Sequence, residues 1–188
     1  MQFDHYLNFA SRFNAEDSSS SMLYEVLKSQ SVADVFVRKT IGLQTEGPCS
    51  VYSDRRIGDT GNVDIVIDTR ITGRDSLVLV ASETDDYSST TEDSLISSYE
   101  NARELYQGKD VYLIYVTQFT DASIADDSGL LLPPTIEEFE QLQDYVGNSE
   151  RLSHISWLDF HGIMKICSVN LSSELVHTLS LHRDWIKT

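Results

Sequence analysis

The sequence contains few of the residues that would mark a secreted or membrane protein. Its 188 residues include two cysteines, Cys49 and Cys167, which form neither a disulfide framework nor the spacing of a metal site. No apolar run approaches the roughly 20 residues that cross a membrane. The first residues also lack the basic-then-apolar pattern of a signal peptide. We therefore expect a cytoplasmic protein whose two reduced thiols serve as small core residues.

Basic residues are scarce as well. Fourteen Lys and Arg stand against 30 Asp and Glu, which gives a net charge of −16. The imbalance is uneven, because residues 1–74 hold ten acids and eight bases whereas residues 75–188 hold twenty acids and six bases. Proteins that bind nucleic acid of any sequence need a basic surface, which this composition does not offer overall. The acidic part indicates either a solubilising surface or a face that binds basic proteins or imitates DNA.

Several common catalytic motifs are missing. The chain has no phosphate-binding P-loop, no dinucleotide-binding glycine motif and no Gly-x-Ser-x-Gly nucleophile elbow. The histidines near the C-terminus have no ligand spacing of the zinc-protease kind, and each is interpreted as a packed or solvated residue. The absence of these motifs excludes the enzyme classes that are defined by them.

The length and composition fit one globular domain, since 40% of the residues are hydrophobic and 10% are aromatic. Three parts are predicted within residues 1–188: N-terminal helices in 1–45, a core sheet and helix in 48–117, and a mostly helical part in 130–188. The N-terminal helices are expected at about 2–13 and from 22 onward, with Gly42 as the stop. A capping box formed by Thr135 and Glu138 is expected to open a helix in the third part.

A lone carboxylate lies inside an aliphatic strand in the centre of the chain. Asp64 interrupts the predicted strand at 63–67, a turn follows, and the next strand, at 77–81, runs into Glu83. Burying an unpaired charge costs several kcal/mol, so Asp64 needs a partner. A hairpin would bring Asp64 beside Glu83, and a divalent cation between the two carboxylates would be a sensible partner. Beyond Glu83 we expect a helix at about 92–107 and a buried strand at 111–117.

This arrangement resembles the PD-(D/E)XK nuclease superfamily, and most closely its RecB-like bacterial and phage branch. In that family an Asp lies in one strand, the next strand ends in Glu-x-Lys, and a helix that begins with Gln-Leu and carries a Tyr follows. Asp64 corresponds to the Asp, Glu83 to the Glu and Asp85 to the Lys. The later correspondences are Ser94 for the Gln, Leu95 for the Leu, Tyr99 for the helical Tyr, and the Ser156-Trp157 pair for a late Ser-Trp element.

The resemblance implies an α/β fold with a central mixed sheet flanked by helices, that is, a restriction-endonuclease-like αβββαβ core. It also implies that Asp64 and Glu83 hold Mg²⁺ or Mn²⁺. Asp85, which has the same strand parity as Glu83, becomes a third carboxylate that can bind metal or act as a general base. Arg55 and Arg56 are either a phosphate clamp at the mouth of the cleft or an exposed loop pair balanced by nearby acids.

Two functions follow, and the sequence leaves both open. The first is a divergent metal-dependent nuclease that hydrolyses DNA phosphodiesters in phage or bacterial DNA processing or defence, with Asp64, Glu83 and Asp85 in its site. The second is a catalytically inactive pseudo-nuclease whose acidic region, 75–188, binds and regulates a basic protein partner. An anti-defence or immunity protein, including one that mimics DNA, would be of this kind. A plain α/β scaffold subunit of a larger complex is a third interpretation.

Overall fold

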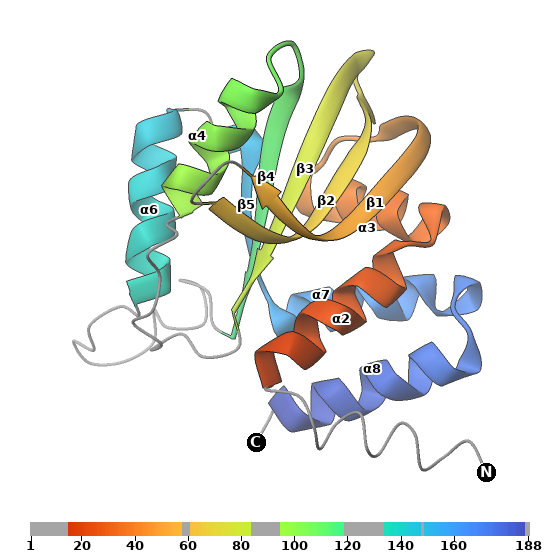
Figure 1. The fold of residues 1–188 in the computed structure, drawn as a ribbon. Helices are drawn as coiled ribbons and strands as arrows, with labels where there is room; N and C mark the ends of the chain where they lie inside the picture. Colours follow the sequence, from red (N-terminus) through yellow and green to blue (C-terminus); the bar gives the residue numbers. More distant parts are fainter. Residues whose placement is uncertain (1–14, 58–60, 84–94, 119–133, 148, 187–188) are drawn as a thin grey trace.

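The computed structural model describes residues 15–57, 61–83, 95–118, 134–147 and 149–186, and in these residues five strands form one mixed sheet (Figure 1). The strands follow one another across the sheet in chain order. β1, β2 and β3 are antiparallel, while β4 lies parallel to β3 and β5 parallel to β4. The bounds are Thr45–Ile57, Gly61–Ile71, Arg74–Ser82, Asp110–Thr117 and Leu152–Ser156. The prediction that the segments 63–67, 77–81 and 111–116 are neighbours in one sheet is confirmed.

Helices cover both faces of this sheet (Figure 1). One face carries four of the described helices, and the other carries two. The first group is α2 (Ala15–Leu27), α3 (Gln30–Ile41), α7 (Trp157–Cys167) and α8 (Ser173–Ile186). The second group is α4 (Leu95–Leu105) and α6 (Pro134–Val146). Two 3₁₀ turns complete the described elements: η1 (Ser149–Arg151) and η2 (Ser168–Asn170). The fold is therefore α/β, as predicted, and it is consistent with a restriction-endonuclease-like core.

The sheet has two hydrophobic cores because successive strand residues point to opposite faces. In β3, Val78 and Val80 pack in the core beneath α2, α3 and α7, whereas Leu77 and Leu79 pack in the core beneath α4 and α6. Strands buried on both faces read as continuous aliphatic runs, which is why the sequence pattern located them.

Local signals explain several of the helix ends. α3 ends at Gly42, whose φ of 81° is left-handed and whose N–H donates to the carbonyl of Arg38, as predicted. Ser156 and Asp159 form a reciprocal capping box at the start of α7. The hydroxyl of Ser172 accepts the N–H of Leu175 at 3.2 Å and so caps α8.

Three sequence expectations about elements need correction or fall outside the description. α6 begins at Pro134, so Thr135 lies within the helix and the predicted capping box with Glu138 is wrong; proline takes the first helical position instead, where its missing N–H costs nothing. Arg55 and Arg56 belong to β1 and not to a loop. The helix expected at 2–13 lies outside the described residues. No helix of the described part is long and apolar enough to cross a membrane.

Candidate functional site

Asp64, near the start of β2, is held by hydrogen-bond donors from two other elements. The backbone N–H of Ser82, at the end of β3, donates to Asp64 Oδ2 at 2.7 Å, and the Ser82 hydroxyl donates to the same oxygen at 2.9 Å. The hydroxyl of Ser20, on α2, donates to Oδ1. The half-buried carboxylate therefore does have partners, as the cost of burial requires, and these partners include hydroxyl and amide groups.

A break in the strand alternation directs Asp64 toward α2. Val63 packs in the core beneath α4, whereas Ile65 packs in the core beneath α2 and α3. The antiparallel register of β2 and β3 pairs Ile65 with Val80, and the Ser82 whose N–H donates to Asp64 lies two residues further along β3.

Glu83 follows β3 directly, and its backbone is fixed on both sides. Its N–H donates to the carbonyl of Val116 in β4 at 2.8 Å, and its own carbonyl accepts the indole N–H of Trp157 at 2.9 Å. These bonds tie the end of β3 to β4 and to the start of α7. That the Glu83 carboxylate faces Asp64 stays a prediction. Asp85 lies outside the described residues.

The described residues place Asp64 and Glu83 at one end of the sheet, and a Mg²⁺ site there stays a prediction. A hard cation of this kind takes oxygen ligands from carboxylates and keeps several water molecules. Both oxygens of Asp64 already accept hydrogen bonds from Ser20 and Ser82. Within the described ranges, no group of three or more His, Cys, Asp or Glu is placed to hold a metal ion. The side chains of Arg55 and Arg56 are not described, so the phosphate clamp stays a prediction.

A partly buried chain of polar groups joins α2, α7 and α8, and the sequence did not reveal it. His182 Nε2 lies 2.9 Å from the hydroxyl of Ser19, and His182 Nδ1 lies 2.9 Å from Nε2 of His161. The indole ring of Trp157 packs against His182 with 4.8 Å between ring centroids. Burial, and to a smaller extent the neighbouring His161, lowers the pKa of His182 to about 3. Ser19 is 0% exposed, so this serine–histidine pair does not meet a substrate.

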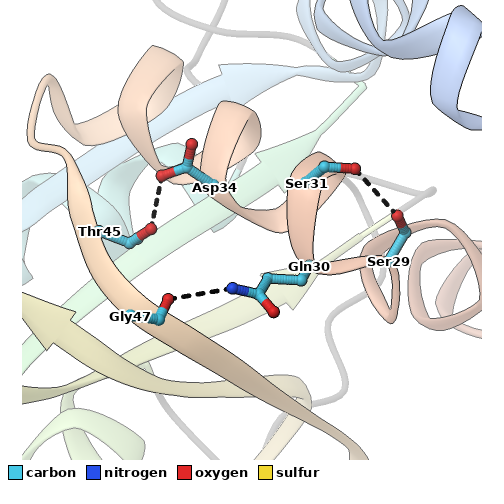
Figure 2. A pocket seen from close by; sticks show the side chains of 6 residues that line it. All are labelled: Ser29, Gln30, Ser31, Asp34, Thr45 and Gly47. Carbon is cyan, nitrogen blue, oxygen red and sulfur yellow. Dashed lines mark hydrogen bonds between the residues drawn. The ribbon is translucent and has the colours of Figure 1, made fainter.

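A polar cavity of about 560 Å³ lies between the start of α3 and β1 (Figure 2). In Figure 2 the amide of Gln30 reaches the carbonyl of Gly47 at 3.2 Å, and the hydroxyl of Thr45 donates to Asp34. Its six lining residues bond largely to one another and include none of the predicted site residues. These hydrogen bonds join the start of α3 to β1. Among the six lining residues, the carboxylate of Asp34 is the one candidate catalytic group, and it already accepts a hydrogen bond from Thr45.

The class that the fold defines is an α/β protein with a five-stranded mixed sheet between helical layers. No family model and no curated protein matches the chain. A weak structural match is the MspJI restriction endonuclease in complex with a 27-mer oligonucleotide, at 15% sequence identity and a TM-score of 0.23. The match covers 74% of this chain and 37% of the endonuclease chain. A likeness at this level identifies no activity.

Replacing Asp64 tests its hydrogen-bonding role. Asp64→Ala leaves the N–H of Ser82 and the hydroxyls of Ser20 and Ser82 without this acceptor, and we expect the free energy of unfolding to fall by about 1–3 kcal/mol. Urea denaturation measures the change. Asp144→Ala, which removes an exposed carboxylate on α6, is the matched control and should change stability by less than about 0.5 kcal/mol. Equal stability of Asp64→Ala and the control would contradict the role.

The lowered pKa of His182 predicts that stability declines in mild acid. An unfolded histidine takes up a proton near pH 6.5, whereas folded His182 stays neutral until about pH 3. The unfolded state therefore binds more protons below pH 6.5, and stability should fall with decreasing pH by about 1.4 kcal/mol per pH unit from this group. His161, Ser19 and Trp157 are the described groups that face it. Urea unfolding between pH 7 and 5, a range above most carboxyl pKa values, measures the slope.

His182→Gln supplies the comparison for that slope, because it removes the titrating ring. The variant should be less stable at pH 7 and should show a shallower dependence on pH. His177→Gln, on the exposed side of the same helix, is the control and should keep the wild-type slope. If the His182 variant keeps that slope too, the buried ring is not the source of the acid sensitivity.

Proposed function

We propose that this protein keeps a nuclease-like fold without hydrolysing phosphodiesters, and that it acts by binding a basic protein partner through an acidic face. The observation that carries the first half is the environment of Asp64. A metal-dependent nuclease needs carboxylates that converge on a cation with open positions for phosphate and water. Asp64 accepts hydrogen bonds from Ser82 and Ser20, so both of its oxygens take part in contacts that hold α2 and β3 to β2.

The second half of the proposal is supported by the outer surface of α4 and α6. Glu104, Glu140 and Asp144 are exposed there. Tyr145 is 56% exposed, and its hydroxyl donates to Glu100, which raises the pKa of the phenol. We call the carboxylates of Glu100, Glu104, Glu140 and Asp144, together with Tyr145, the α4–α6 acidic face. An exposed tyrosine among carboxylates suits a protein interface, because aromatic side chains supply contact area while charges steer the encounter.

The competing function is the divergent nuclease, with Asp64, Glu83 and Asp85 as ligands of Mg²⁺ or Mn²⁺ and DNA as substrate. Glu83 follows β3 directly and so lies at the same end of the sheet as Asp64, which is the placement that this function needs. A metal that bound there would share the oxygens of Asp64 with the donors from Ser20 and Ser82. The two functions therefore make opposite predictions about divalent cations.

Divalent cations should neither stabilise the protein nor activate it. A ligand of the native state raises the melting temperature, so millimolar Mg²⁺ or Mn²⁺ should give the same melting temperature as KCl of equal ionic strength. Duplex and single-stranded DNA should stay intact after incubation with protein and Mn²⁺. Asp64→Asn is the control for contaminating nuclease. Mn²⁺-dependent cleavage by the wild type that this substitution abolishes would establish the divergent nuclease instead.

The acidic face predicts charge-dependent binding of a basic peptide. A fluorescent decalysine peptide serves as the probe, and fluorescence anisotropy measures its affinity at 50 and 150 mM salt. Replacing Glu104, Glu140 and Asp144 together by Lys should weaken binding at least about tenfold, because the attractive field at that face is reversed. Binding by the wild type should weaken as salt rises.

The matched control makes the same three charge reversals on another part of the surface. Glu46, Glu174 and Asp184 are exposed on β1 and α8, and their joint replacement by Lys gives the same net charge as the first variant. This control should lose much less affinity than the α4–α6 variant. Equal losses in the two variants would show that only the total charge matters, and would refute the α4–α6 face as the binding site.

A further inference from the structure

A basic pocket lies at the end of the sheet away from Asp64. It is bounded by the β2–β3 hairpin, the C-terminal end of α4, the start of β4 and η1, and it encloses about 630 Å³. Arg70, near the end of β2, lies six residues from Asp64, or about 20 Å along an extended strand. The basic residues that line the pocket are Arg70, Arg74, Arg103, Lys109 and Arg151.

The concentration of positive charge is unusual for this chain. Five of its fourteen Lys and Arg line this one pocket, although the protein as a whole carries −16. Three carboxylates pair with four of these bases: Asp68 with Lys109 at 2.7 Å, Asp75 with Arg70 at 3.3 Å, and Asp110 with both Arg151 and Arg74. The five bases therefore outnumber their three ion-paired acids by two, and Glu150 on η1 is a further acid near Tyr112.

Several of these side chains are positioned by packing and by shared hydrogen bonds. Asp110, whose side chain is 15% exposed, accepts from Arg151 at 2.7 Å and from Arg74 at 3.5 Å, so one largely buried carboxylate holds two guanidinium groups at the pocket. The Arg151 guanidinium lies over the ring of Tyr112 and that of Arg103 over the ring of Tyr99, each at 5.9 Å from the ring centroid. Aromatic support of this kind limits the motion of a guanidinium and orients its donors.

We propose that this pocket binds a phosphate monoester dianion. A phosphate monoester carries about −1.5 to −2 charges at neutral pH, so it suits a pocket in which bases outnumber acids. Guanidinium groups donate two parallel hydrogen bonds to phosphate oxygens, and the pocket offers four arginines from four separate elements. A volume of about 630 Å³ is in the range of small-ligand sites. Neither Asp64 nor the carboxylates of the α4–α6 acidic face line the pocket, although Arg103 also lies close to Tyr145 of that face.

Isothermal titration calorimetry with two phosphate monoesters tests the proposal. AMP and O-phosphoserine share the phosphate group and differ in everything attached to it, while adenosine and serine lack the phosphate. Both phosphorylated probes should bind at pH 7.5 and 50 mM salt, and both unphosphorylated ones should not. Binding of AMP alone, or equal binding of AMP and adenosine, would show that the pocket recognises something other than the phosphate group and would overturn the proposal, as would no binding by either monoester.

Arg103 supplies the decisive variant because it is exposed, so its replacement should leave the melting temperature unchanged. Arg103→Gln should lower the affinity for both monoesters at least about fivefold. Arg103→Lys keeps the charge but loses the planar guanidinium, so its affinity should lie between those of Arg103→Gln and the wild type. Arg183→Gln, an exposed arginine on α8, is the control and should bind as the wild type does. If Arg103→Gln and Arg183→Gln weaken monoester binding equally, the loss of affinity would come from the change in net charge alone, and the proposed site would be refuted.

Discussion

Asp64 places a carboxylate near the start of a buried strand, and this carboxylate needs hydrogen-bond donors. That need determines how the elements around it pack. Asp64 meets that need with donors from α2 and from the end of β3, so one side chain joins three elements that are distant in sequence. The break in alternation between Val63 and Ile65 turns the side chain toward α2. Because leaving a buried polar group unpaired costs more than its hydrogen bond contributes, this junction constrains how α2 can pack on the sheet.

The same end of the sheet is tied together by further polar contacts. The backbone of Glu83 bonds to β4 and to the indole of Trp157, and Trp157 in turn packs against His182. His182 connects through Ser19 back to α2, one residue from the serine that bonds to Asp64. Charge is arranged around this frame, with carboxylates on α4 and α6 and a group of arginines at the hairpin end. A strongly acidic chain thus presents two surfaces of opposite sign.

The sequence predicted the fold, whereas the site residues Asp64, Glu83 and Asp85 stay predictions. Aliphatic runs such as residues 77–81 located the central strands, because strands covered on both faces need apolar side chains throughout. Gly42 marked a helix end because only a residue tolerant of positive φ fits there. The partner of Asp64 could not be found in this way, since Ser20 lies 44 residues upstream and serine is common in polar segments. The buried pairing of His161 and His182 escaped for the same reason, because two helices must pack before the rings meet.

Paramagnetic broadening by Mn²⁺ tests directly whether Asp64 is a hydrogen-bonded structural residue or a metal ligand. The amide of Ser82 donates to Asp64 at 2.7 Å, so a Mn²⁺ ion bound by that carboxylate would lie within a few ångströms of the Ser82 N–H and would broaden its resonance beyond detection. In a ¹H–¹⁵N spectrum recorded during a Mn²⁺ titration, our account predicts that the Ser82 signal stays as sharp as those of amides far from any carboxylate. Selective loss of that signal at substoichiometric Mn²⁺ would contradict it.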